Sequence, residues 1–136
     1  MEEVLIIDDY EDITDAIASV IKYAFKDKYK VSIFNDSELA LYYLKTNGPF
    51  KMIFLDLDMP KISGDTLIPM IKELYPNQKI KIITGKSDSQ LEELINNKYP
   101  EYKLVRKPFQ LYEIIEDLED KSLVKPTKQK SESSIS

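Results

Sequence analysis

Short runs of apolar and β-branched residues alternate along the chain with segments of helical periodicity. Runs of four or five such residues are typical of strands buried on both faces, as in a parallel sheet. They occur at Glu3–Ile7, Lys30–Phe34, Met52–Leu55, Ile80–Ile83 and Tyr102–Val105. The pattern therefore predicts five strands.

Each predicted strand is followed by a segment whose apolar residues recur every three or four positions, the spacing of an amphipathic helix. The first such helix is expected over residues 12–27. The buried positions expected in the other four are Leu39, Ala40, Tyr43 and Leu44; Leu67, Ile68, Ile71 and Leu74; Leu91, Leu94 and Ile95; and Leu111, Ile114, Ile115 and Leu118. Asp36 fits an N-cap for the second helix, and Ser87 with Gln90 fits a capping box for the fourth.

Strands that alternate with helices predict parallel pairing, right-handed crossovers and helices on both faces of one sheet. We interpret residues 1–120 as a single doubly wound α/β domain. Residues 121–136 lack apolar periodicity and are rich in Ser and Lys, which is typical of a disordered tail or linker.

Composition restricts the chemistry. The 136 residues include no His and no Cys, and the net charge is −5. Imidazole and thiolate chemistry are therefore excluded, and the molecule as a whole has no electrostatic reason to bind nucleic acid or an anionic membrane. No apolar run is long enough to cross a bilayer, so we expect a soluble cytoplasmic protein.

Polar residues gather where the predicted strands end. Asp8 and Asp9 follow the first strand, Asp56 the third, Thr84 the fourth and Lys107 the fifth. Each alone is more typical of a turn, a cap or a solvated surface group than of a catalyst. Together they should meet, because ligands of an open parallel sheet bind beyond the carboxyl ends of its strands.

Three carboxylates at one place repel one another unless a cation enters. A site of oxygen ligands alone suits Mg²⁺. With a lysine and a hydroxyl group facing the cation, such a site is equipped for phosphoryl transfer, in which a carboxylate oxygen attacks in line. The residues therefore predict an aspartyl phosphate.

In this order and at this spacing, the residues resemble the receiver domain of two-component response regulators. The similarity comprises the acidic pair after the first strand, the stretch FLDLDMPKISG, then IITG and finally KPF. It implies a flavodoxin-like fold with five helices and a five-stranded sheet in the order 2-1-3-4-5.

The resemblance also implies roles for the acidic residues. Asp56 would be the phosphoacceptor, and Asp9 would bind Mg²⁺ directly, with Asp8 assisting through water. The backbone carbonyl of Asp58 would complete the protein ligands of the metal.

Thr84 would hydrogen-bond the phosphoryl group and Lys107 would pair with it, and Pro108 resembles the proline that often follows this lysine through a cis peptide. The resemblance implies a phosphohistidine as the phosphoryl donor, and because the chain has no His, this donor would lie on a sensor histidine kinase or phosphotransfer protein. The chain would catalyse its own phosphorylation and slow dephosphorylation without turning over a metabolite.

Two features depart from the family pattern. Leu104 stands where an aromatic switch residue is usual, and Tyr102, on the same strand face by alternation, would partly substitute. Asp58 and Lys86 carry opposite charges at positions that flank the path of the attacking water. We hypothesise an ion pair across the mouth of the site that slows hydrolysis; the alternative is two solvated charges that never meet.

The region from 85 to 106 is where we expect a downstream protein to read the phosphorylated state, and homodimerisation on phosphorylation stays open. Both a stand-alone receiver and a receiver cut from a longer regulator or hybrid kinase remain open. Met1 directly before the first strand favours an authentic N-terminus.

A rival resemblance is to phosphatases of the haloacid dehalogenase type, in which Asp56 would be the nucleophile and Asp58 the acid/base. In those enzymes the nucleophile follows the first strand and the acidic pair comes last. Here the order is reversed, and Pro60 stands where Thr or Val is expected.

Overall fold

A parallel sheet forms the centre of the molecule in the computed structural model, which describes residues 1–85 and 89–118. Its strand order is β2-β1-β3-β4-β5, which confirms the predicted topology. The strands are β1 (Glu3–Ile7), β2 (Lys30–Phe34), β3 (Met52–Asp56), β4 (Ile80–Thr84) and β5 (Lys103–Arg106). The fifth strand begins one residue later than predicted, because the Tyr102 amide donates to the Tyr99 carbonyl in the preceding turn.

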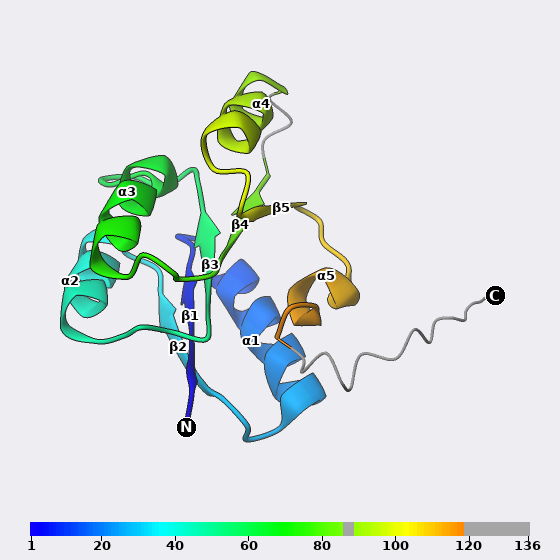
Figure 1. Cartoon of the computed structure of the whole chain (residues 1–136). Coiled ribbons are helices and arrows are strands. Elements are labelled where there is room, and N and C mark those ends of the chain that lie inside the picture. The colour runs from blue at the N-terminus through cyan, green and yellow to red at the C-terminus, as the bar shows by residue number, and fades with distance from the viewer. Residues whose placement is uncertain (86–88, 119–136) are drawn as a thin grey trace.

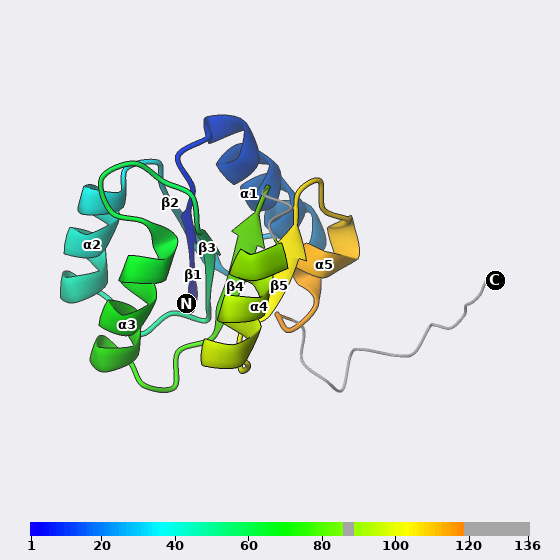
Figure 2. The same cartoon turned by 90° about the horizontal axis from the view of Figure 1, so that it is seen from above.

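Helices cover both faces of the sheet (Figures 1 and 2). One face is covered by α2 (Ser37–Thr46), α3 (Gly64–Leu74) and α4 (Ser89–Lys98). The other face is covered by α1 (Glu11–Phe25) and the short α5 (Leu111–Ile115). The predicted doubly wound α/β fold is thus confirmed.

Alternation along the strands divides the core into two apolar layers. Ile53 and Leu55 of β3 pack beneath α2, α3 and α4, whereas Met52 and Phe54 pack beneath α1 and α5. All four side chains are buried, as expected for a central parallel strand. The apolar run before Asp56 therefore anchors that carboxylate at the end of the central strand.

Some expected core positions were wrong. Leu39 is 61% exposed, and Leu74 and Leu111 are also exposed. Leu39 lies on the outer side of α2 because Ala40 and Leu44 face the sheet, and Leu74 and Leu111 are terminal residues of their helices. Periodicity locates a helix, but the stripe that faces the sheet depends on how the helix packs.

The capping predictions have different outcomes. The Asp36 carboxylate accepts hydrogen bonds from the amides of Glu38 and Leu39, as expected of an N-cap. Ser87 and the side chains of Gln90, Leu91 and Leu94 lie outside the described residues, as do the predicted domain limit at 120 and the tail over 121–136.

Candidate functional site

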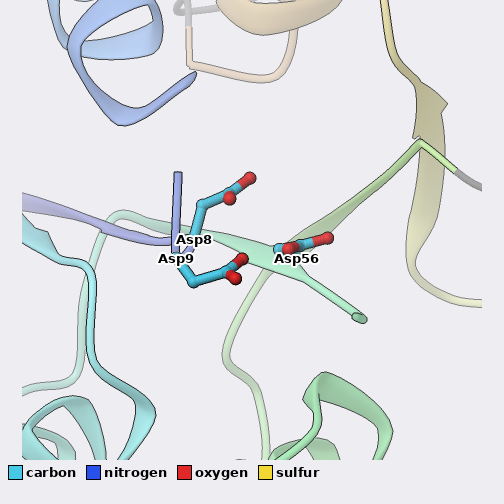
Figure 3. Close-up of side chains that lie close together, drawn as sticks. All are labelled: Asp8, Asp9 and Asp56. Carbon is cyan, nitrogen blue, oxygen red and sulfur yellow. The ribbon is translucent and has the colours of Figure 1, made fainter. Parts of the chain in front are cut away.

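Three carboxylates meet at the carboxyl edge of the sheet (Figure 3). Strands β1 and β3 are neighbours and pair Ile7 with Leu55, so the residues that follow, Asp8 and Asp56, emerge side by side. One oxygen from each of Asp8, Asp9 and Asp56 lies within 4.8 Å of the others. Residues far apart in sequence are thus brought together by strand register alone.

Close backbone packing holds the loop after Asp56. The Gly64 amide donates to the Leu57 carbonyl at 2.9 Å, which places the start of α3 against this loop. A Cβ at Gly64 would lie 2.2 Å from the Asp56 carbonyl oxygen, so a larger residue would displace the loop. The Ser37 hydroxyl donates to the Pro60 carbonyl and accepts from the Ile62 amide, both at 3.0 Å, which ties the same loop to α2.

Lys107 reaches this cluster from the segment after β5. Its ammonium lies 2.8 Å from Asp8 Oδ2 and 3.7 Å from Asp56 Oδ1. Its backbone amide donates to the Thr84 carbonyl at 2.8 Å, which ties the lysine to the end of β4. The peptide bond between Lys107 and Pro108 is cis, as the resemblance implied.

The environment of Asp56 disfavours its ionised form. Burial, and then the negative charge of Asp8, raise the pKa of Asp56 to about 7, against the opposing effects of the Lys107 charge and of a hydrogen bond from the Asp58 amide. Asp56 is only 2% exposed, so water does little to stabilise its charge. One lysine therefore does not fully compensate the acidic cluster.

The donor set fits a hard divalent cation. Asp9 Oδ1 is buried and has no hydrogen-bond partner among the described residues, so it offers a lone pair that the protein does not use. Together with one oxygen each from Asp8 and Asp56, it makes a set of carboxylate oxygens without nitrogen or sulfur. Such a set suits Mg²⁺, which takes few protein carboxylates and keeps several waters.

The cleft above the cluster is open and has a volume of about 460 Å³. Its lining residues are Tyr10, Asp12, Ile13, Asp56, Asp58, Gly85 and Lys107. The Asp58 side chain is exposed at this cleft, and its amide donates to Asp56 Oδ1 at 3.3 Å. Asp56 is therefore the carboxylate at the base of the cleft, and Asp58 lies on its rim.

Three other predicted residues, Thr84, Leu104 and Tyr102, lie in or next to β4 and β5. Thr84 is buried at the end of β4, one residue beyond Ile83, the partner of Asp56. Leu104 and Tyr102 share one apolar layer, which confirms that they lie on the same face. However, Arg106 is the residue paired with Thr84, so Tyr102, in the turn before β5, lies four positions before the partner of Thr84. Lys86 lies outside the described residues.

Sequence reasoning missed Tyr10. Its ring centroid lies 5.5 Å from the Lys107 ammonium, and the ring lines the cleft that contains Asp56. The signal that could have found it is its position directly after the acidic pair, at the mouth of the predicted site.

The chain belongs to the response regulator receiver domain family, whose model matches residues 4–119. It is 29% identical over 110 residues to the response regulator receiver protein CpdR of Brucella abortus, which covers 80% of this chain and 89% of the relative. The family places the chain among the receiver domains of two-component signal transduction and favours this interpretation over the phosphatase resemblance.

Solved structures share the fold. The chemotaxis protein CheY4 of Vibrio cholerae is 21% identical with a TM-score of 0.72, covering 87% of this chain and 96% of that one. A signal receiver domain of an HD domain-containing protein from Pseudomonas fluorescens is 23% identical with a TM-score of 0.74, covering 86% of this chain and 90% of that one.

None of the helices in the described part of the chain is long and apolar enough to span a bilayer.

Proposed function

We propose that this receiver accepts a phosphoryl group on Asp56 from a phosphohistidine of a sensor kinase or phosphotransfer protein, with Mg²⁺ as its cofactor. The observation that carries the proposal is the setting of Asp56. This buried carboxylate lies at the base of an open cleft, 3.7 Å from the Lys107 ammonium and beside Asp8 and Asp9. No other carboxylate in the described residues combines these features.

The acidic residues would have two roles, metal binding and nucleophilic attack. Asp8, Asp9 and Asp56 would hold Mg²⁺, and the Asp58 carbonyl would complete its protein ligands; the bound ion would neutralise charge on the phosphoryl oxygens. An Asp56 oxygen forms a new bond to phosphorus as the phosphorus–nitrogen bond of the donor breaks. The electron pair of the broken bond stays on the imidazole nitrogen. Because the second ring nitrogen of the donor already carries a proton, the donor histidine leaves as a neutral imidazole and takes up no further proton.

Lys107 and Thr84 respond to the new charge. In this structure the Lys107 ammonium is shared between Asp8 and Asp56. A phosphoryl group on Asp56 adds negative charge near this ammonium and offers acceptors to the Thr84 hydroxyl. We therefore expect Lys107 and Thr84 to bind the phosphoryl oxygens.

This response would reach the partner through the region from 85 to 106. The hydrogen bond from the Lys107 amide to the Thr84 carbonyl joins the ends of β5 and β4, and α4 lies between these strands in sequence. A shift at Thr84 would therefore bias the position of α4 and of the surface that a downstream protein reads. With Leu104 in the place of an aromatic switch residue, this bias would come from the strand ends rather than from a rotating ring.

Four finer points stay proposals. The chain would act as a signalling module and not turn over a metabolite, and residues 1–120 would be the receiver, with 121–136 as a tail. Phosphorylation would permit homodimerisation.

An ion pair between Asp58 and Lys86 would slow hydrolysis of the phosphate. Asp58→Asn and Lys86→Ala should therefore each change the lifetime of the phosphorylated protein, and unchanged lifetimes in both variants would refute this ion-pair hypothesis.

The test is direct labelling. The full chain is incubated with Mg²⁺ and acetyl phosphate, and the intact mass is followed over time. We expect one phosphoryl group on the wild type and none on Asp56→Asn, whereas Asp65→Asn, an acid in the first turn of α3, serves as the matched control and should be labelled like the wild type. Equal labelling of Asp56→Asn would refute the assignment, and repeated phosphate release from a simple ester would favour the phosphatase interpretation.

A further inference from the structure

One wall of the cleft is apolar although its base is charged. Tyr10 and Ile13 line the cleft together with Asp56 and Lys107. The Tyr10 side chain is 62% exposed, and its ring centroid lies 5.5 Å from the Lys107 ammonium. An exposed aromatic face thus lies directly beside the proposed transfer site.

The backbone of Tyr10 is held firmly. Its amide donates to Asp8 Oδ1 at 3.0 Å, and its carbonyl accepts from the amides of Ile13 and Thr14 at 3.1 and 3.2 Å. These bonds fix the backbone of Tyr10, and with it the point from which the ring projects, relative to the acidic cluster and to the first turn of α1. The side chain makes no capping hydrogen bond, although Tyr10 is the N-cap of α1. Since Ser, Thr, Asp or Asn caps a helix better, capping does not explain a tyrosine here.

The distribution of charge in the cleft describes the ligand that fits it. The Lys107 ammonium at the base favours an anionic group, the Tyr10 ring favours a flat apolar or cationic group, and the rim carries the carboxylates of Asp12 and Asp58. A phosphoryl group joined to an imidazole ring has this arrangement. When its second nitrogen is protonated the ring is cationic, which suits both an aromatic face and a carboxylate rim.

We infer that Tyr10 is a specificity-determining residue that stacks on the imidazole ring of the phosphohistidine donor, with Ile13 beside it. The inference rests on the proposed function. The Tyr10 ring favours donors with an aromatic leaving group over donors such as acetyl phosphate, whose leaving group has no ring. It acts on donor selection and does not touch the reacting carboxylate.

Two small donors separate this role from a structural one. The full chain is phosphorylated with monophosphoimidazole and with acetyl phosphate in the presence of Mg²⁺, and the apparent second-order rate constant is measured for each donor. In Tyr10→Ala the ratio of the two rate constants, imidazole donor over acetyl donor, should fall about fivefold or more. Tyr10→Phe keeps the ring and should restore the ratio of the wild type.

Two further variants serve as controls. Tyr10→Leu keeps apolar bulk without a π face and should behave like Tyr10→Ala, which keeps the test available if the alanine variant folds poorly. Tyr23→Ala removes a tyrosine that is 78% exposed near the other end of α1 and should leave the ratio unchanged.

The outcomes are distinguishable. An equal fall with both donors would mean that Tyr10 only supports Lys107 or Asp8, and an unchanged ratio would mean that the ring does not contact the donor; either result overturns the inference and leaves the proposed function intact. If neither donor labels Asp56 of the wild type, the proposed function and the inference fail together.

Discussion

A buried lysine and a half-buried lysine lie at opposite ends of the sheet, and their partners differ. Lys107 at the carboxyl edge faces the side-chain carboxylates of Asp8 and Asp56 at the base of an open cleft. Lys81 of β4 lies toward the amino edge, is 1% exposed, and donates to the backbone carbonyls of Glu113 and Glu116 at 2.7 and 2.8 Å. Lys81 also lies 3.6 Å from Asp117 Oδ2, but its shortest contacts are to backbone carbonyls, whereas those of Lys107 are to carboxylates.

The difference shows that burial by itself does not identify a functional cation. Burial lowers the pKa of Lys81, against the opposing charges of Asp117 and Glu116. Its ammonium donates to two carbonyls near the end of α5 that accept no other backbone hydrogen bond within residues 1–85 and 89–118, so it works as a cap supplied by a strand. Lys107 has its shortest contacts to the carboxylates of Asp8 and Asp56, whose charge would change if the proposed cation or phosphoryl group bound. We therefore assign Lys81 to the stability of the fold and Lys107 to the site.

The largest effect expected from this comparison is on phosphorylation. Lys107→Met removes the cation that would stabilise the transferring phosphoryl group, and the rate of labelling by acetyl phosphate should fall about a hundredfold or more. The measurement is the initial rate of mass change with Mg²⁺ present. A rate within tenfold of the wild type would contradict the assignment of Lys107 to the site.

The reciprocal variant should lose stability instead. Lys81→Met leaves two carbonyls of the α5 end without their donor, and the free energy of unfolding should fall by about 2 kcal/mol, since removing the buried charge offsets part of the loss. Urea unfolding monitored by circular dichroism measures this change. The folded variant should still be labelled on Asp56, and loss of labelling would show that the two ends of the sheet do not have separate roles.

The acidic cluster makes stability depend on pH. The pKa of Asp56 is raised to about 7 from 3.8, so between these values the folded state binds this proton more tightly than the unfolded state. Without metal, the wild type should therefore lose stability as the pH rises from about 4 to 7 and lose no more from this group above that range.

Asp56→Asn removes this contribution. At neutral pH and in the presence of a chelator, the free energy of unfolding of the variant should exceed that of the wild type by at least about 1 kcal/mol. The difference should be smaller at acid pH. Urea unfolding of both proteins across the pH range tests this expectation. Saturating Mg²⁺ should narrow the difference, because a cation favours the ionised carboxylate; an advantage independent of pH would contradict the explanation.

The smallest effect is expected from an exposed lysine near Lys81. The Lys103 ammonium lies 3.0 Å from Asp117 and 3.5 Å from Glu116, but its side chain is 54% exposed. Lys103→Ala should change the free energy of unfolding by less than about 1 kcal/mol, because solvent screens exposed ion pairs. A loss as large as that of Lys81→Met would show that charge pairing, and not carbonyl capping, holds the end of α5.

Much of the fold could be predicted because strands and helices have different hydrophobic periods. The strand bounds agree within one residue, and Asp36 caps α2 as expected. The exposure of Leu39 could not be predicted, because an amphipathic period does not say which edge of the apolar stripe meets the sheet. The carbonyl partners of Lys81 in β4 could not be predicted from the residues around it, because these carbonyls belong to a helix much later in the chain.

The amino-acid sequence by itself determined the order and type of the elements, and with them the edge at which Asp8, Asp9, Asp56, Thr84 and Lys107 gather, because parallel strands present their carboxyl ends together. Only the tertiary structure decided what surrounds that edge. The ring of Tyr10 over Lys107 and the capping of α5 by Lys81 are contacts between distant segments, and such contacts depend on helix packing and side-chain direction, which no local pattern records.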